Sequence, residues 1–119
     1  MGRAIRTELE VRGLPYAGGV DKDEGNLSML VSASDVVIDF SSPGALKDNL
    51  EDAMLAKKPV VIGTTGLEES HHHLIDAAAH TIPVLQTGNM SLGVNLIAAL
   101  VENAAARLGD DWDIEILEM

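Results

Sequence analysis

The chain has 119 residues, enough for one domain, and its single Trp, Tyr and Phe predict a core of aliphatic side chains. A formal net charge of −11 repels phosphodiester backbones and anionic membrane surfaces, so we expect neither nucleic acid nor a membrane as a partner. The absence of cysteine excludes disulfides and thiolate chemistry, and without a secretory signal or a run of about 18 apolar residues the sequence favours a cytoplasmic protein.

The N-terminal part of the chain predicts two helices and a weak strand between them. Apolar residues recur at helical spacing within residues 3–12, and Gly13 can supply the left-handed residue that often ends a helix. Residues 14–20 are a strand candidate weakened by a proline and a Gly-Gly pair, and this candidate ends at Asp21. Residues 27–34 predict one or two helical turns.

Three apolar runs that end in small polar residues follow, at residues 35–40, 59–63 and 82–86. Such runs, when helix-length segments separate them, are typical of buried parallel strands covered by helices on both faces. The helices are expected at residues 43–57 and 68–80. Ligands of open α/β sheets bind at the carboxyl ends of the strands, so we expect the functional residues directly after these three runs.

The C-terminal part predicts the longest helix and one more strand. Residues 91–108 carry an apolar stripe at helical spacing, and Gly109 ends it. Residues 112–119 alternate apolar and acidic side chains, as in a strand with one solvent-exposed face. The whole order predicts an α/β fold with a parallel sheet and flanking helices.

Four stretches of this sequence resemble the dihydrodipicolinate reductase family, the NAD(P)H-dependent enzymes of lysine and diaminopimelate synthesis. They are IDFSSP (38–43), VIGTTG (61–66), GNMSLGVN (88–95) and DIEILEM (113–119). The resemblance covers nearly the whole chain in order. It implies a partial dinucleotide-binding domain of the Rossmann type at residues 1–90, and the connecting helix and first strand of an α+β substrate and tetramerisation domain at residues 91–119.

The resemblance also implies that parts of the family pattern lie outside this sequence. The family begins with a strand and a glycine-rich phosphate loop, and only the tail of that loop matches the start of this chain, at Met1 and the two residues after it. The family's catalytic His and Lys follow the position of Met119. We therefore expect an incomplete Rossmann domain that holds no catalytic residue and is inactive as an isolated chain.

Asp21 and Lys22 are candidates for contacts with the adenosine half of the cofactor. A carboxylate after the second strand of a Rossmann domain can accept hydrogen bonds from the ribose hydroxyls, although from spacing alone Asp21 could equally be a solvated loop residue. The ammonium group of Lys22 could meet a 2′-phosphate. The cofactor is therefore expected to be NADPH or NADH, without a preference between them.

The Gly-Thr-Thr-Gly stretch follows a predicted buried strand, so we expect its backbone amides and both hydroxyls to face the crevice at the strand ends. Glycine allows the backbone to approach a planar ring closely, although an ordinary turn would use the same residue types. The resemblance implies that Gly63 and Thr64 contact the cofactor, with Gly63 near the nicotinamide carboxamide. It further implies that Thr65 binds the cofactor and lies near a carboxylate of the substrate.

The remaining candidates for cofactor contacts are single residues at chain turns. Phe40 ends the neighbouring strand and would cover the pyrophosphate and nicotinamide ribose side. By resemblance, Met1 belongs to the phosphate loop, and Gly88, Asn89 and Met90 form a hinge whose main chain contacts the nicotinamide. Asn89 could instead be only a turn residue.

No metal site is expected, because the three successive histidines 71–73 point about 100° apart on a helix and cannot close on one ion. The family resemblance implies hydride transfer to a cyclic dicarboxylate substrate by a homotetramer. Two alternative functions stay open.

One is a non-catalytic cofactor-binding or oligomerisation subunit. The other is a receiver-like phosphoacceptor module using Asp39, although the acidic pair and the Lys that such a module needs are not found at the required places.

Overall fold

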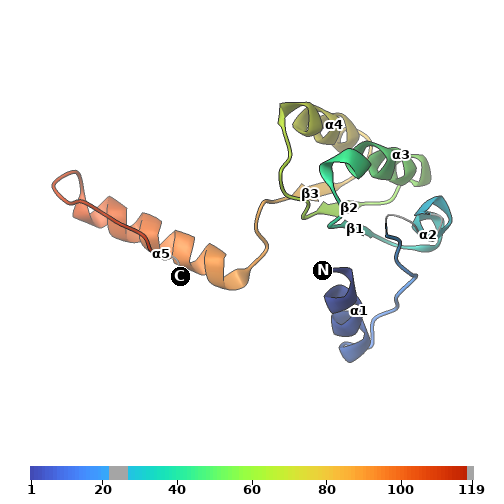
Figure 1. Ribbon diagram of the computed structural model, residues 1–119, viewed down its shortest axis with the longest axis horizontal. Coiled ribbons are helices and arrows are strands. Elements are labelled where there is room, and N and C mark those ends of the chain that lie inside the picture. Colours follow the sequence, from blue (N-terminus) through green and yellow to red (C-terminus); the bar gives the residue numbers. More distant parts are fainter. Residues whose placement is uncertain (22–26, 118–119) are drawn as a thin grey trace. The chain divides into compact units, whose positions relative to one another are not determined.

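The computed structural model describes residues 1–21 and 27–117 (Figure 1). The chain divides into two compact units, Met1–Gly88 and Asn89–Met119, and each is described by itself.

The first unit contains most of the regular structure. Its elements are α1 (Gly2–Val11), α2 (Leu27–Ala33), β1 (Val37–Asp39), a 3-10 helix (Pro43–Ala45), α3 (Leu46–Ala56), β2 (Val60–Ile62), α4 (Glu69–Ala79) and β3 (Val84–Gln86). The second unit contains α5 (Leu92–Leu108). All the helices expected from the sequence are thus confirmed. The three expected parallel strands are confirmed as well, as β1, β2 and β3.

The three strands form one parallel sheet in the order β1-β2-β3. Val37 pairs with Val60 and Val60 with Val84, so the strands start and end at the same level. The prediction of an α/β fold with an incomplete, Rossmann-type parallel sheet and flanking helices is confirmed.

One face of the sheet packs against α3 and α4, which Figure 1 shows on the same side of it. Side chains of alternate strand residues meet the apolar stripes of the two helices there, as the strand and helix periods require. The buried core residues are Leu46, Leu50, Ala53, Val60, Ile62, Ile75, Ala78 and Ile82. On the opposite face the neighbours Ile38 and Leu85, which flank Val61, are 41% and 59% exposed.

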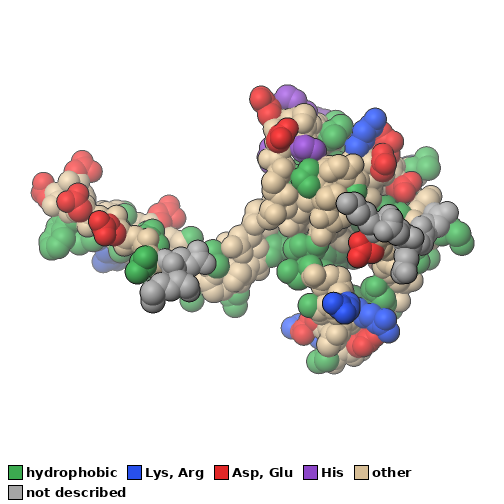
Figure 2. All heavy atoms as spheres, viewed as in Figure 1, with side chains coloured by type: hydrophobic (Ala, Val, Ile, Leu, Met, Phe, Trp, Pro, Cys, Tyr) green, Lys and Arg blue, Asp and Glu red, His purple; other side chains and the backbone are tan. Residues whose placement is uncertain are grey.

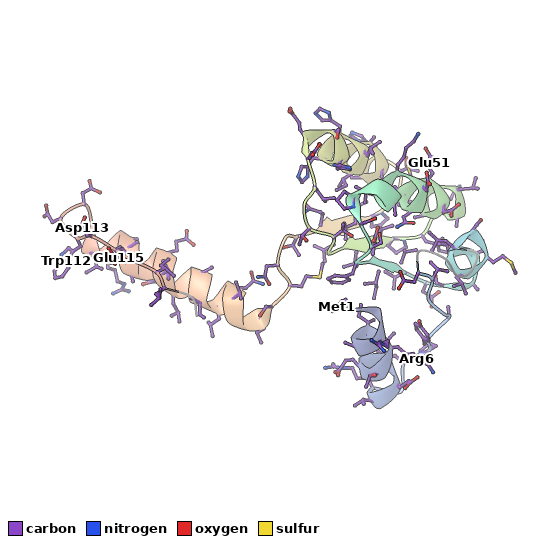
Figure 3. All side chains as sticks on the ribbon, in the orientation of Figure 1. Met1, Arg6, Glu51, Trp112, Asp113 and Glu115 are labelled. Carbon is purple, nitrogen blue, oxygen red and sulfur yellow. The ribbon has the colours of Figure 1, made fainter. Side chains whose placement is uncertain are left out.

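Two strands expected from the sequence are not formed. Residues 14–20 contain no helix or strand, and Asp21 makes only an isolated bridge. Residues 112–117 follow α5 as an irregular segment, on which Figure 3 labels Trp112 and Glu115, whereas residues 118–119 lie outside the described part. A strand exists only where a neighbour satisfies its backbone groups, and the second unit has no other strand among its described residues. The alternating pattern could not reveal whether a partner was available.

The second unit consists mainly of α5, which begins at Ser91. The Ser91 hydroxyl oxygen accepts a hydrogen bond from the Val94 backbone N–H at 3.4 Å, a side-chain cap that ties down one of the free donors of the first turn. Large apolar side chains of this helix are exposed, Leu96 and Leu100 among them. In the described part of the chain no helix has the length and apolar content needed to cross a membrane.

Lys57, at the end of α3, offers a prediction about stability. It adopts a left-handed conformation with φ 56° and ψ 42°, which strains any residue with a Cβ atom. We expect Lys57→Gly to raise the free energy of unfolding by about 1 kcal/mol in urea titrations, because glycine adopts this conformation without strain. Lys58→Gly is the matched control, since Lys58 lacks a positive φ, and an equal gain there would contradict the explanation.

Candidate functional site

The carboxyl ends of the three strands lie side by side at one edge of the sheet. Asp39, Ile62 and Gln86 are paired across the strands, so the segments after them start at the same level. This edge is where ligands of open parallel sheets bind, and the sequence puts its Gly-Thr-Thr-Gly stretch there.

A buried carboxylate ties two of these strand ends together. Asp39 is 4% exposed, and its Oδ1 accepts hydrogen bonds from the Ser41 backbone N–H at 2.8 Å, from the Ser41 hydroxyl at 2.6 Å and from the Thr64 hydroxyl at 3.1 Å. Its Oδ2 accepts a hydrogen bond from Asn49 Nδ2 on α3 at 3.0 Å. The cluster therefore joins the end of β1, the loop after β2 and helix α3.

Phe40 and Gly63 meet directly across the same two strands. The Phe40 ring lies so close to Gly63 that a Cβ atom added there would overlap the ring. The Gly63 backbone N–H also donates to the Asp39 carbonyl oxygen at 2.8 Å. Close contact of ring and backbone is thus the reason for glycine at position 63, and both residues are half-buried.

The expectation that both threonine hydroxyls face the crevice is wrong for Thr64. Thr64 is 4% exposed, and its hydroxyl is turned inward to Asp39. Thr65, by contrast, is exposed. One threonine therefore anchors the loop to Asp39, while the other is available at the surface.

A pocket of about 200 Å³ opens at this edge, beside the loop after β2 and the first turns of α4. Its lining residues are Thr64, Thr65, Gly66, Leu67, His72, Gln86 and Gly88. Of the candidates from the sequence, Thr64, Thr65 and Gly88 are brought together here. No Asp or Glu is among these lining residues, although the chain carries 19 of them.

His72 and Gln86 were missed by the sequence analysis. The His71 ring accepts a hydrogen bond from the Glu68 backbone N–H at 3.0 Å and so caps α4, which leaves His72 on the side of the helix that lines the pocket. Figure 2 shows the histidines gathered over α4. The sequence did hold a signal for Gln86, because it is the last residue of a predicted strand and hence lies at the ligand-binding edge.

The other candidates lie elsewhere. Met1 is the exposed residue at the start of α1, where Figure 3 labels it, and Asp21 is exposed. Lys22 lies outside the described residues. Asn89 and Met90 belong to the second unit, where the Asn89 side-chain oxygen accepts the backbone N–H two residues further on at 2.8 Å.

Comparisons with known proteins agree with the resemblance seen in the sequence. The family described as "Dihydrodipicolinate reductase, N-terminus" matches residues 7–90. The 4-hydroxy-tetrahydrodipicolinate reductase of Zymomonas mobilis subsp. mobilis is 50% identical over 125 aligned residues, which cover 100% of this chain and 49% of the relative. The reductase of the same name from Rhizobium meliloti is 44% identical and that from Helicobacter hepaticus 45%, over 92% and 97% of this chain and 44% and 43% of the relatives.

The chain thus spans less than half the length of each of these relatives. The family match covers the sheet, the Gly-Thr-Thr-Gly loop and the pocket beside it, the parts of the structure in which the candidate site was found. This chain belongs to the dihydrodipicolinate reductase family and matches its N-terminal part.

Proposed function

We propose that this chain provides the nucleotide-binding part of an NAD(P)H-dependent reductase that acts on a cyclic dicarboxylate in lysine and diaminopimelate synthesis. The observation that carries the proposal is the Gly-Thr-Thr-Gly loop, which borders a pocket at the carboxyl ends of a parallel sheet in a chain of this family. When bound, the nicotinamide nucleotide would supply the hydride.

The residues at the strand ends suit a flat ring. Because Gly63 has no side chain, the Phe40 ring packs directly against its backbone. The ring and the neighbouring amide groups together can form a flat contact surface for a ligand ring. In this proposal the backbone of Gly63 and Thr64 and the Gly88–Met90 segment contact the nicotinamide half. Asp21, Lys22 and Met1 contact the adenosine and pyrophosphate half.

The pocket also suits an anionic substrate. The Thr65 hydroxyl, the His72 ring and the Gln86 amide of the pocket lining can all donate hydrogen bonds. The residues that line the pocket include no carboxylate that would repel a dicarboxylate. Since the Thr64 hydroxyl is already bonded to Asp39, Thr65 is the residue that we assign to a substrate carboxylate.

The catalytic acid and its Lys partner are proposed to come from outside these 119 residues, as the family resemblance implies. The complete enzyme is proposed to be a cytoplasmic homo-oligomer, a homotetramer as in the resemblance. A receiver-like function is disfavoured by the burial of Asp39, because an acceptor carboxylate must be reached by a phosphate donor. A non-catalytic cofactor-binding or oligomerisation subunit is the alternative that an activity measurement must decide.

The proposal can be tested with a chimera in which residues 1–119 replace the matching part of the Zymomonas mobilis reductase. The chimera should oxidise NADPH or NADH only when the dihydrodipicolinate-type substrate is present. The same chimera without any substrate is the control for slow background oxidation. A folded chimera that binds nucleotide but has no substrate-dependent oxidation would favour the non-catalytic alternative.

His72 carries a prediction about the substrate. If its ring donates a hydrogen bond to a substrate carboxylate, His72→Ala should raise the KM for the substrate about fivefold to tenfold, since such a bond contributes about 1 kcal/mol. The KM for NADPH should stay within about twofold. His73→Ala removes the next histidine of α4, which is not among the pocket residues, and should change neither constant. Equal effects of both substitutions would contradict the assignment.

Lys22 carries a prediction about the choice of nucleotide. In the chimera, Lys22→Ala should weaken NADPH binding by about 1–2 kcal/mol, because a charge-assisted hydrogen bond to the 2′-phosphate is lost, and should leave NADH binding almost unchanged. Fluorescence titrations with the two nucleotides measure this. Equal losses for NADPH and NADH would show that Lys22 makes no phosphate contact.

A further inference from the structure

We infer that Asp39 is a positioning residue of the proposed nucleotide site. Its carboxylate fixes the ends of β1 and β2 in the arrangement that the site uses, without touching a ligand itself. The part of the inference that concerns nucleotide binding rests on the proposed function, whereas the part that concerns the shape of the strand ends does not.

Both oxygens of the Asp39 carboxylate accept hydrogen bonds. Four hydrogen bonds reach Asp39 from Ser41, Asn49 and Thr64, at 2.6–3.1 Å, and both oxygens take part. A carboxylate can accept hydrogen bonds at both of its oxygens, which suits this set of donors. An amide at this position would turn an NH2 group toward one of the donors and break that contact.

These hydrogen bonds position the loop after β2 and the chain that follows Phe40. The bond from Thr64 holds its hydroxyl inside the protein and fixes the loop that carries Thr65, whose side chain is exposed beside the pocket. The bond from Ser41 curls the chain just after Phe40, whose ring lies on Gly63. Asp39 is not among the pocket residues, so it acts behind the site through these neighbours.

The energetics of a buried carboxylate favour a local role for Asp39. Removing a carboxylate from water is costly, and its hydrogen bonds only partly offset that cost, so a buried charge is poor evidence for overall stability. A set of directed hydrogen bonds from two loops and a helix does, however, select one geometry among several that an apolar contact would allow. The role that fits these observations is local positioning rather than general stabilisation.

The polarity of the Asp39–Asn49 pair provides the test. Asp39→Asn places an NH2 group opposite the Asn49 NH2 group or opposite the Ser41 N–H, and Asn49→Asp places two carboxylates within hydrogen-bond distance. The double variant Asp39→Asn/Asn49→Asp restores a donor opposite an acceptor. Asp48→Asn removes an exposed carboxylate next to Asn49 and is the matched control.

Amide hydrogen exchange in the 119-residue chain measures the result. The Ser41 amide donates to the Asp39 carboxylate, and the Gly63 amide donates to the Asp39 backbone carbonyl oxygen, which moves with the end of β1. Both amides should exchange at least about tenfold faster in each single variant and return to within about threefold in the double variant. The Val60 amide, which donates to the Pro83 carbonyl oxygen in the core, should be unaffected throughout. If a single variant unfolds entirely, recovery of protection in the double variant supports the inference.

Unchanged exchange at Ser41 and Gly63 in Asp39→Asn would overturn the inference. Loss of Val60 protection that the double variant does not restore would also overturn it, because Asp39 would then be a general structural residue.

In the chimera, Asp39→Asn should raise the KM for NADPH about tenfold with kcat changed less than about threefold, and the double variant should reverse this. Unaffected kinetics would overturn the link to nucleotide binding. A chimera that is inactive before any substitution would instead refute the proposed function. The positioning role of Asp39 would then be tested by hydrogen exchange alone.

Discussion

Replacing Gly63 with alanine is expected to destabilise the first unit by about 1–3 kcal/mol, because the new Cβ atom would overlap the Phe40 ring and displace the ring or the strand end that carries it. The same displacement should weaken nucleotide binding by the chimera about tenfold or more, since a misplaced contact surface costs much of its binding energy. Urea unfolding of the chain and fluorescence titration of the chimera measure the two effects.

Gly44→Ala is the matched control for this prediction. No atom lies within 4 Å of the position that a Cβ at Gly44 would take, so this substitution should be nearly neutral. A second variant, Phe40→Leu/Gly63→Ala, should recover part of the lost stability because the smaller side chain leaves room for the Cβ atom. Equal stability of the Gly63→Ala chain and the original chain would show that the contact of ring and backbone is unimportant.

Leu46→Ala is expected to have the largest effect on folding. Leu46 is fully buried at the start of α3, within the core between that helix and the sheet. Truncating a fully buried leucine removes apolar burial and leaves a cavity, which together cost about 2–5 kcal/mol. For a small unit of marginal stability this loss should appear as a large fall in the urea midpoint, or as an unfolded chain.

Leu55→Ala makes the same chemical change in the same helix at a position that is 82% exposed. Its cost should be less than about 0.5 kcal/mol, since an exposed side chain loses little burial. Equal destabilisation of the two alanine variants would show that Leu46 does not lie in a packed core between α3, α4 and the sheet.

The helices and the three parallel strands could be predicted because each carries its signal within its own residues. The runs that became β1, β2 and β3 are mainly apolar, as is typical of strands in a parallel sheet, and turn residues follow each of them. The helix between β1 and β2 shows its apolar stripe at Leu46, Leu50 and Ala53. Such local patterns need no knowledge of the rest of the chain.

The two failed strands depend on partners that no local pattern can supply. Residues 112–117 alternate as a strand would, yet a strand forms only beside another one. Residues 14–20 carry a proline and two glycines, so their own preference for a strand is weak and only pairing could impose it.

The candidate site was predictable in its place but not in its side-chain directions. That ligands bind after β2 follows from the parallel topology, which the sequence indicated. Which of two adjacent threonines points inward depends on Asp39, which lies 25 residues earlier in the chain. The position of His72 at the pocket depends in the same way on the turn at which α4 begins.

The central claim is that the loop after β2 holds the nicotinamide end of the nucleotide, and threonine methyl NMR of the chimera tests it most directly. Adding NADPH should shift the methyl signal of Thr65, which lines the pocket, and leave that of Thr81 unchanged, because Thr81 precedes β3 at the opposite end of the sheet. The Thr65 signal is identified by its loss in Thr65→Ser. Saturation with NADPH that moves Thr81 and leaves Thr65 in place would contradict the account.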